Sequence, residues 1–127
     1  MDDPIQSATV EVLTARTALL RLLPELAFGG GAGRSTAQRL IRLLTPPDWM
    51  MNAHPVSAEL AVLIRIADPI IAAGTSDVVD DGGRVCDRQR IDAASLWSAA
   101  QDRAWALVAA MNRLAILREA QRMIAAD

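Results

Sequence analysis

The C-terminal stretch from Asp92 to Ala126 contains neither glycine nor proline. It is rich in Ala, Leu, Met, Arg and Gln, which have the highest intrinsic helix propensities. A carboxylate at Asp92 or Asp87 can accept hydrogen bonds from the free N–H groups of a first turn. Arg118 and Arg122 stand near the other end, where cations suit the helix dipole. The stretch therefore predicts one unbroken helix.

This helix is long for the chain that contains it. At about 1.5 Å per residue it spans roughly 50 Å. A compact domain of 127 residues has a diameter of only about 36 Å. We therefore expect either an elongated bundle or an overhanging helix that another chain covers.

Apolar residues form two rows along the same helix. The first row holds Trp97, Ala100, Ala104, Leu107, Met111 and Leu114, and the second holds Trp105, Ala109, Ile116, Ala120 and Met123. A helix that packs on one core needs a single apolar stripe about 100° wide. Two rows indicate a central helix, or one that packs on its own domain and on a partner.

The large residues of these rows are the candidates for a partner interface. We assign the candidate interface to Trp97, Trp105, Leu107, Met111 and Leu114. Trp97 and Trp105 are eight residues apart, which places them about 80° apart around the axis. Either both belong to the core, or at least one anchors a protein interface, where Trp is enriched.

Composition narrows the class of protein. The chain has 127 residues, enough for one domain with a core, and 52% of them are apolar. A net charge of −2 argues against non-specific nucleic-acid binding. No apolar run reaches the ~18 residues of a membrane span. The lone Cys86 excludes an internal disulfide. We expect a cytoplasmic protein.

Turn and cap residues divide the remaining chain into three further helices. Asp3 and Pro4 are typical of a helix start, and Pro24 predicts an end or a kink near Leu23. Ser35 and Gln38 have the spacing of a capping box. The prediction is an all-α bundle with four main helices at about 4–23, 35–44, 57–73 and 90–126. A small β-hairpin or a loop is expected at 75–90.

Candidate binding chemistry is sparse. Arg34, Arg39 and Arg42 form a basic patch, which is either a solvated face or a contact site for an anion, an acidic partner or nucleic acid. His54 precedes Pro55, which indicates a loop, and one His with one Cys cannot form a structural zinc site. We identify no catalytic set, no metal ligands and no cofactor fingerprint.

These patterns favour a small non-catalytic adaptor, regulatory or assembly protein that acts through helix faces, as a homodimer or with another protein. The alternative is a binder or enzyme for a small anionic ligand, and the third possibility is a nucleic-acid-binding regulator. The residues that could hold such a ligand inside the bundle are Arg16, Arg21, Arg65, Gln101 and Arg113.

Overall fold

The computed structural model describes residues 3–28, 33–75 and 88–126. Over these ranges the chain forms four α-helices and one short 3-10 helix, and no strand. They are α1 (Pro4–Phe28), α2 (Arg34–Leu44), η1 (Trp49–Asn52), α3 (Ala53–Thr75) and α4 (Arg88–Ala126). This confirms the predicted all-α bundle with a long C-terminal helix. The predicted hairpin or loop at 75–90 lies largely outside the described residues.

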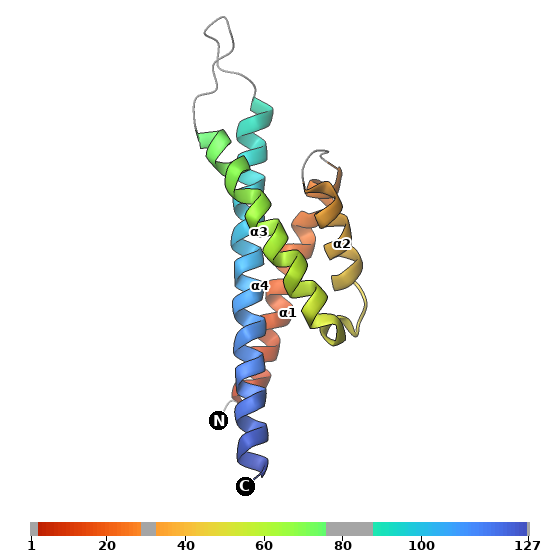
Figure 1. The fold of residues 1–127 in the computed structure, drawn as a ribbon, viewed down its shortest axis with the longest axis vertical. Helices are drawn as coiled ribbons and strands as arrows, with labels where there is room; N and C mark the ends of the chain where they lie inside the picture. Colours follow the sequence, from red (N-terminus) through yellow and green to blue (C-terminus); the bar gives the residue numbers. More distant parts are fainter. Residues whose placement is uncertain (1–2, 29–32, 76–87, 127) are drawn as a thin grey trace, which may run out of the picture.

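The longest helix, α4, is the axis of the molecule. Its 39 residues span about 58 Å. Figure 1 shows an elongated molecule in which α3 lies beside the first half of α4 and α1 lies beside the second. Both chain ends are at the same end of the bundle, so α1 and α4 are antiparallel. The shorter α2 packs against α1 and α3. The bundle is therefore elongated. The described residues still do not cover the end of α4, since every residue of 118–125 is exposed.

The core follows the first of the two apolar rows of α4, which we call the inner row. Its six members are all buried: Trp97, Ala100, Ala104, Leu107, Met111 and Leu114. The small alanines of the row let neighbouring helices approach closely, while the leucines fill the space between them. The sequence pattern leaves open which of the two rows packs on the chain's own core, and the structure buries this one.

The helix starts differ in how they are capped. The Asp3 carboxylate accepts a 3.0 Å hydrogen bond from the Ile5 N–H, as an N-cap should. The capping box predicted at Ser35 and Gln38 is wrong. The N-cap of α2 is Gly33, which has a positive φ of 105° and makes no side-chain cap bond. A backbone in this region favours glycine over any other residue.

Pro24 predicts an end or a kink near Leu23. The end, and with it the 4–23 range, is wrong, because α1 continues through Pro24 to Phe28. Proline removes one helical hydrogen bond, to the carbonyl four residues earlier. Beyond it, Leu26 and Ala27 are both buried in the core. Their burial stabilises a last turn that local propensity disfavours.

The third helix begins four residues earlier than the predicted 57–73 range, at Ala53. Pro55 fits in this first turn, because N–H groups there have no partner within the helix. His54 therefore lies in the first turn of α3 and not in a loop, and it is exposed.

A single arginine joins α1 to the end of α2. The Nε of Arg16 donates to the Leu44 carbonyl at 2.7 Å, and its Nη2 donates to the Thr45 carbonyl at 3.3 Å. Its guanidinium also lies over the buried Trp49 ring, 5.6 Å from the ring centroid. Arg16 thereby satisfies carbonyls that a helix C-terminus leaves without partners.

Candidate functional site

The second apolar row of α4 faces away from the core. With Asn112, which falls on the same stripe, its members are Trp105, Ala109, Asn112, Ile116, Ala120 and Met123, and we call them the outer row. Every one of them is exposed. The large side chains leave 55% (Trp105), 68% (Ile116) and 64% (Met123) of their surface accessible. The outer row is therefore a mainly apolar surface that the described residues leave uncovered.

The helical period explains why the row is continuous. Its members are three or four residues apart, so they fall within a stripe about 80° wide. From Trp105 to Met123 the stripe runs about 27 Å along the helix. It lies roughly opposite the inner row. The bundle packs against the inner face of α4 and leaves the outer face in solvent.

Ion pairs flank the outer row. Arg113 pairs with Glu11 of α1 at 3.6 Å, and Arg122 pairs with Glu119 at 2.6 Å. All four side chains are at least half exposed, so water screens these pairs and each contributes little to stability. Asp102, one turn before Trp105, adds one exposed negative charge. The rim of the row therefore carries charges of both signs.

The structure places the five residues assigned to the candidate interface on two different faces of α4. Trp97, Leu107, Met111 and Leu114 are buried in the chain's own core, where their packing partners are intramolecular. Trp105 alone is exposed. Sequence periodicity found both rows, but nothing in the pattern shows which row faces inwards, and Asn112 was not included in either.

A groove lies between α2 and α3 on another face. It encloses about 490 Å³ and is lined by Arg39, Arg42, Leu43, Pro55, Ala58 and Glu59. Its floor is apolar. Arg39 Nε pairs with Glu59 Oε1 at 2.9 Å, while Arg42 has no ion-pair partner among the described residues. Arg34, the third residue of the basic patch, is exposed at the start of α2 and does not line the groove.

The sequence indicates only the basic residues of this groove. Arg39 and Arg42 belong to the predicted basic patch. The Glu59 carboxylate comes from another helix and neutralises one of them, and no local pattern links Glu59 to Arg39. The second carboxylate oxygen of Glu59 is buried and has no hydrogen-bond partner within the described part of the chain.

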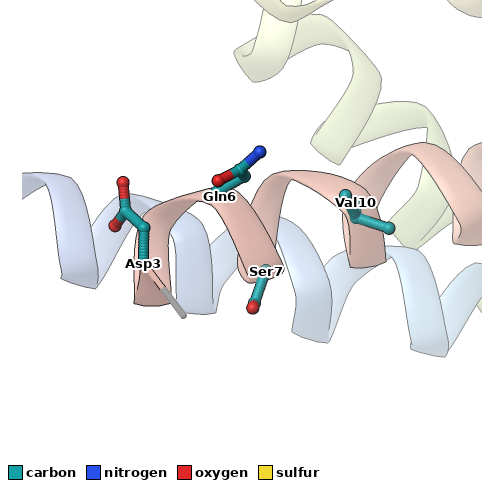
Figure 2. Close-up of a pocket in the computed structure, with 4 residues that line it drawn as sticks. All are labelled: Asp3, Gln6, Ser7 and Val10. Atoms are coloured by element: carbon teal, nitrogen blue, oxygen red, sulfur yellow. The ribbon is translucent and has the colours of Figure 1, made fainter. Parts of the chain in front are cut away.

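A second hollow of about 420 Å³ lies on the outside of α1, where Asp3, Gln6, Ser7 and Val10 line it. Figure 2 shows that Asp3 and Gln6 extend to one side of the helix and Ser7 to the other. The Asp3 carboxylate already caps the helix. These side chains do not converge on a point where a reacting atom could bind.

The polar residues considered for a ligand site inside the bundle do not meet in one cavity. Arg16 holds the end of α2. Gln101 Nε2 donates to the Ile64 carbonyl at 3.1 Å and to Asp68 Oδ1 at 2.6 Å. Three further members, Arg21, Arg65 and Arg113, are exposed. Arg16 and Gln101 thus join helices to one another.

Neither metal ligands among the described residues nor similarity to other proteins indicates a function. No three His, Cys, Asp or Glu side chains gather as a metal site within residues 3–28, 33–75 and 88–126. None of the helices in these ranges combines the length and the apolar character that crossing a bilayer requires. Comparisons with protein-family models, with curated proteins and with solved structures gave no match. The exposed surfaces of the described residues are therefore the observations from which a function can be inferred.

Proposed function

We propose that this protein is a non-catalytic helical adaptor or assembly protein that acts by protein–protein contact through the outer row of α4. One observation carries the proposal: the longest helix exposes a stripe in which every member except Asn112 is apolar, with a tryptophan at one end. Contiguous apolar patches of several hundred Å² on a folded chain mark interaction sites. Tryptophan is among the residues that dominate binding energy at such sites.

The test is site-specific photo-crosslinking in the cell that makes the protein. A photoreactive benzoylphenylalanine replaces Ile116 in the outer row. In a matched control it replaces Gln121, which is also exposed on α4 but lies about 140° away around the helix. We expect a protein adduct from position 116 and little from position 121.

Adducts of equal yield from the two positions would contradict the proposal, because contact would then not be confined to the outer row. No adduct from position 116 would also contradict it. A second photoreactive variant at Ala109 guards against an unfavourable angle at one position, since Ala109 lies on the same stripe.

The groove between α2 and α3 supports a second candidate function, the binding of a small anion with an apolar tail. Arg42 stands without an ion-pair partner, within the described residues, at the rim of an apolar floor. Calorimetric titration with decanoate tests this. Binding that Arg42→Ala removes and Arg21→Ala preserves would support it. Absence of heat at millimolar decanoate would reject it.

Nucleic-acid binding has less support. Of the three arginines of the basic patch, Arg39 is paired with Glu59. Two exposed cations, Arg34 and Arg42, are few for a surface that must neutralise several phosphates.

A further inference from the structure

We propose that the partner of the outer row is a second copy of this chain, packed antiparallel about a two-fold axis that lies between the two outer rows at the level of Leu114 along α4. This inference rests on the proposed function, because it names the partner of the same surface. Three observations carry it: the symmetry of the row, the area that it offers and the charges beside it.

The outer row is nearly symmetric about its own midpoint. Trp105 and Met123 each lie nine residues from Leu114, and Asn112 and Ile116 each lie two residues from it. Ala109 and Ala120 lie five and six residues away. When two such helices run antiparallel, each member of the row meets another member of the row. This is the self-complementarity that a two-fold interface requires.

The resulting pairs fit together by size. Trp105 of one copy meets Met123 of the other, and a thioether beside an aromatic ring is a favourable contact. Ala109 meets Ala120, so that the helices can approach closely at these positions, and Ile116 of each copy meets Asn112 of the other. The two Asn112 residues are about 6 Å apart along the helix direction, so that their amides can reach each other across the axis.

The antiparallel arrangement also covers the exposed end of α4. Residues 118–125 are all exposed. In this arrangement they lie along the Trp105 region of the second copy, which its own core supports from behind. In a parallel pair these ends would meet only each other. Antiparallel helices also place opposite ends of their dipoles side by side.

The available area favours a partner with an equally apolar surface. The three large side chains each expose more than half of their surface. With about 200 Å² for a large side chain, these three expose about 370 Å², and the smaller Ala109, Asn112 and Ala120 bring the row to roughly 500 Å². Two copies together bury about 1,000 Å², the lower limit for a specific interface. We therefore expect a dimer with a dissociation constant in the micromolar range.

The charges beside the row do not oppose self-association. A surface rimmed by one sign of charge would repel its own copy. Here, Arg113 and Glu11 balance each other, as do Arg122 and Glu119. Asp102 leaves one unbalanced charge at the end of the row, which is a small term at physiological ionic strength.

The first part of the test measures association of the purified full chain by sedimentation velocity over a wide concentration range. We expect a monomer–dimer equilibrium. Ile116→Glu should weaken it at least ~100-fold, because it places a charge in the middle of the apolar row. Gln121→Glu is the matched control and should leave it unchanged. Circular dichroism should show equal helix content in all three proteins.

The second part determines the direction of packing by disulfide trapping in a Cys86→Ser background. Ala109→Cys and Ala120→Cys are oxidised separately and as a mixture. In the antiparallel dimer, the two copies of residue 109 are about 15 Å apart, beyond the ~7 Å Cα limit of a disulfide. We therefore expect cross-linked dimers mainly in the mixture. In a parallel dimer each variant would cross-link by itself.

The two proposals fail in different ways. A chain that stays monomeric at all concentrations, or variants that cross-link only with themselves, overturns antiparallel self-association. If position 116 still forms adducts with a different protein in cells, the proposed function stands without it. If the chain is monomeric and position 116 forms no adduct, both are wrong.

Discussion

Gly33→Ala is the substitution for which the structure gives the clearest cost. Gly33 caps α2 with φ at +105°. A Cβ added there would lie 2.2 Å from Cη2 and 2.7 Å from Cζ2 of the buried Trp97 ring. Ordinary carbon–carbon contacts are about 3.5–4.0 Å. The ring would have to move by more than 1 Å, in a core that is already filled.

Two physical terms add up at this position. Holding an L-residue in the left-handed region costs roughly 1–2 kcal/mol. Overpacking a core by one carbon typically costs about 1–3 kcal/mol. We therefore expect Gly33→Ala to lower the free energy of unfolding by about 2–5 kcal/mol. This is a large fraction of the ~5–15 kcal/mol that stabilises a typical domain.

Urea unfolding followed by circular dichroism measures this loss, and a double-mutant cycle with Trp97→Phe identifies its cause. The phenyl ring lacks the indole atoms that the new Cβ would meet. Gly33→Ala should therefore cost less in the Trp97→Phe background, with a coupling of about 1–3 kcal/mol. Ser35→Ala is the matched control. It should cost under ~0.5 kcal/mol, because no side-chain cap bond is made at the start of α2.

Two outcomes would refute this reasoning. A loss below ~1 kcal/mol for Gly33→Ala would mean that the start of α2 does not pack on Trp97 as described. An equal loss in both backgrounds would assign the whole cost to the backbone conformation and none to the contact.

Three further predictions follow from single contacts. Arg16→Lys should lower the free energy of unfolding by about 1.5–3 kcal/mol in urea, because an ammonium cannot reproduce the two carbonyl contacts and the stacking on Trp49. An unchanged stability of the variant would mean that Arg16 does not fix the end of α2 to α1. Gln101→Glu should lower the free energy of unfolding by about 1–3 kcal/mol, because it replaces a donor to Asp68 by a second carboxylate. Asp68→Asn in the same chain should restore much of this stability. If it restores none, the contact between residues 101 and 68 is not the source of the loss. Trp97→Ala should cost about 3–5 kcal/mol, whereas Trp105→Ala should stay within ~0.5 kcal/mol at concentrations where the chain is monomeric; equal losses in thermal unfolding would mean that the two faces of α4 are not distinct.

The long helix could be predicted because its signals are local. The stretch from Asp92 to Ala126 has no helix breaker, and its propensities agree along the whole length. Pro24 shows the opposite case. Its local signal predicts an end or a kink near Leu23, yet α1 continues because Leu26 and Ala27 are buried by residues distant in the sequence. Tertiary packing overrides propensity at such positions.

The start of α2 could not be read from its own residues. Ser35 and Gln38 have the spacing of a capping box, but the helix begins at Arg34, and its N-cap is Gly33. The close approach of Gly33 to Trp97 joins residues that are 64 positions apart in the chain. A glycine-rich stretch by itself does not show which glycine is constrained. Only the contact with Trp97 of α4 shows that Gly33 is the constrained glycine.

The two tryptophans of α4 show where sequence reasoning about the site ends. Trp97 and Trp105 belong to apolar rows of similar length on one helix. Periodicity establishes that both rows exist, but the positions of α1 and α3 decide which row they cover. Trp97 lies in the inner row and is buried, while Trp105 remains 55% exposed. The groove residue Glu59 was missed for the same reason, since its partner Arg39 lies on another helix.

The rigidity of α4 is what makes its outer row suited to binding. An interface formed by loops loses conformational entropy when it orders, and that loss reduces affinity. The outer row avoids most of it, because the inner row on the same helix is already fixed in the core from Trp97 to Leu114. A Gly substitution at Ala109 should therefore weaken association more than its lost methyl group explains, since it would loosen the helix beneath the row. Ala109→Ser, which keeps a Cβ, is the comparison, and equal association by the two variants would show that helix rigidity contributes nothing.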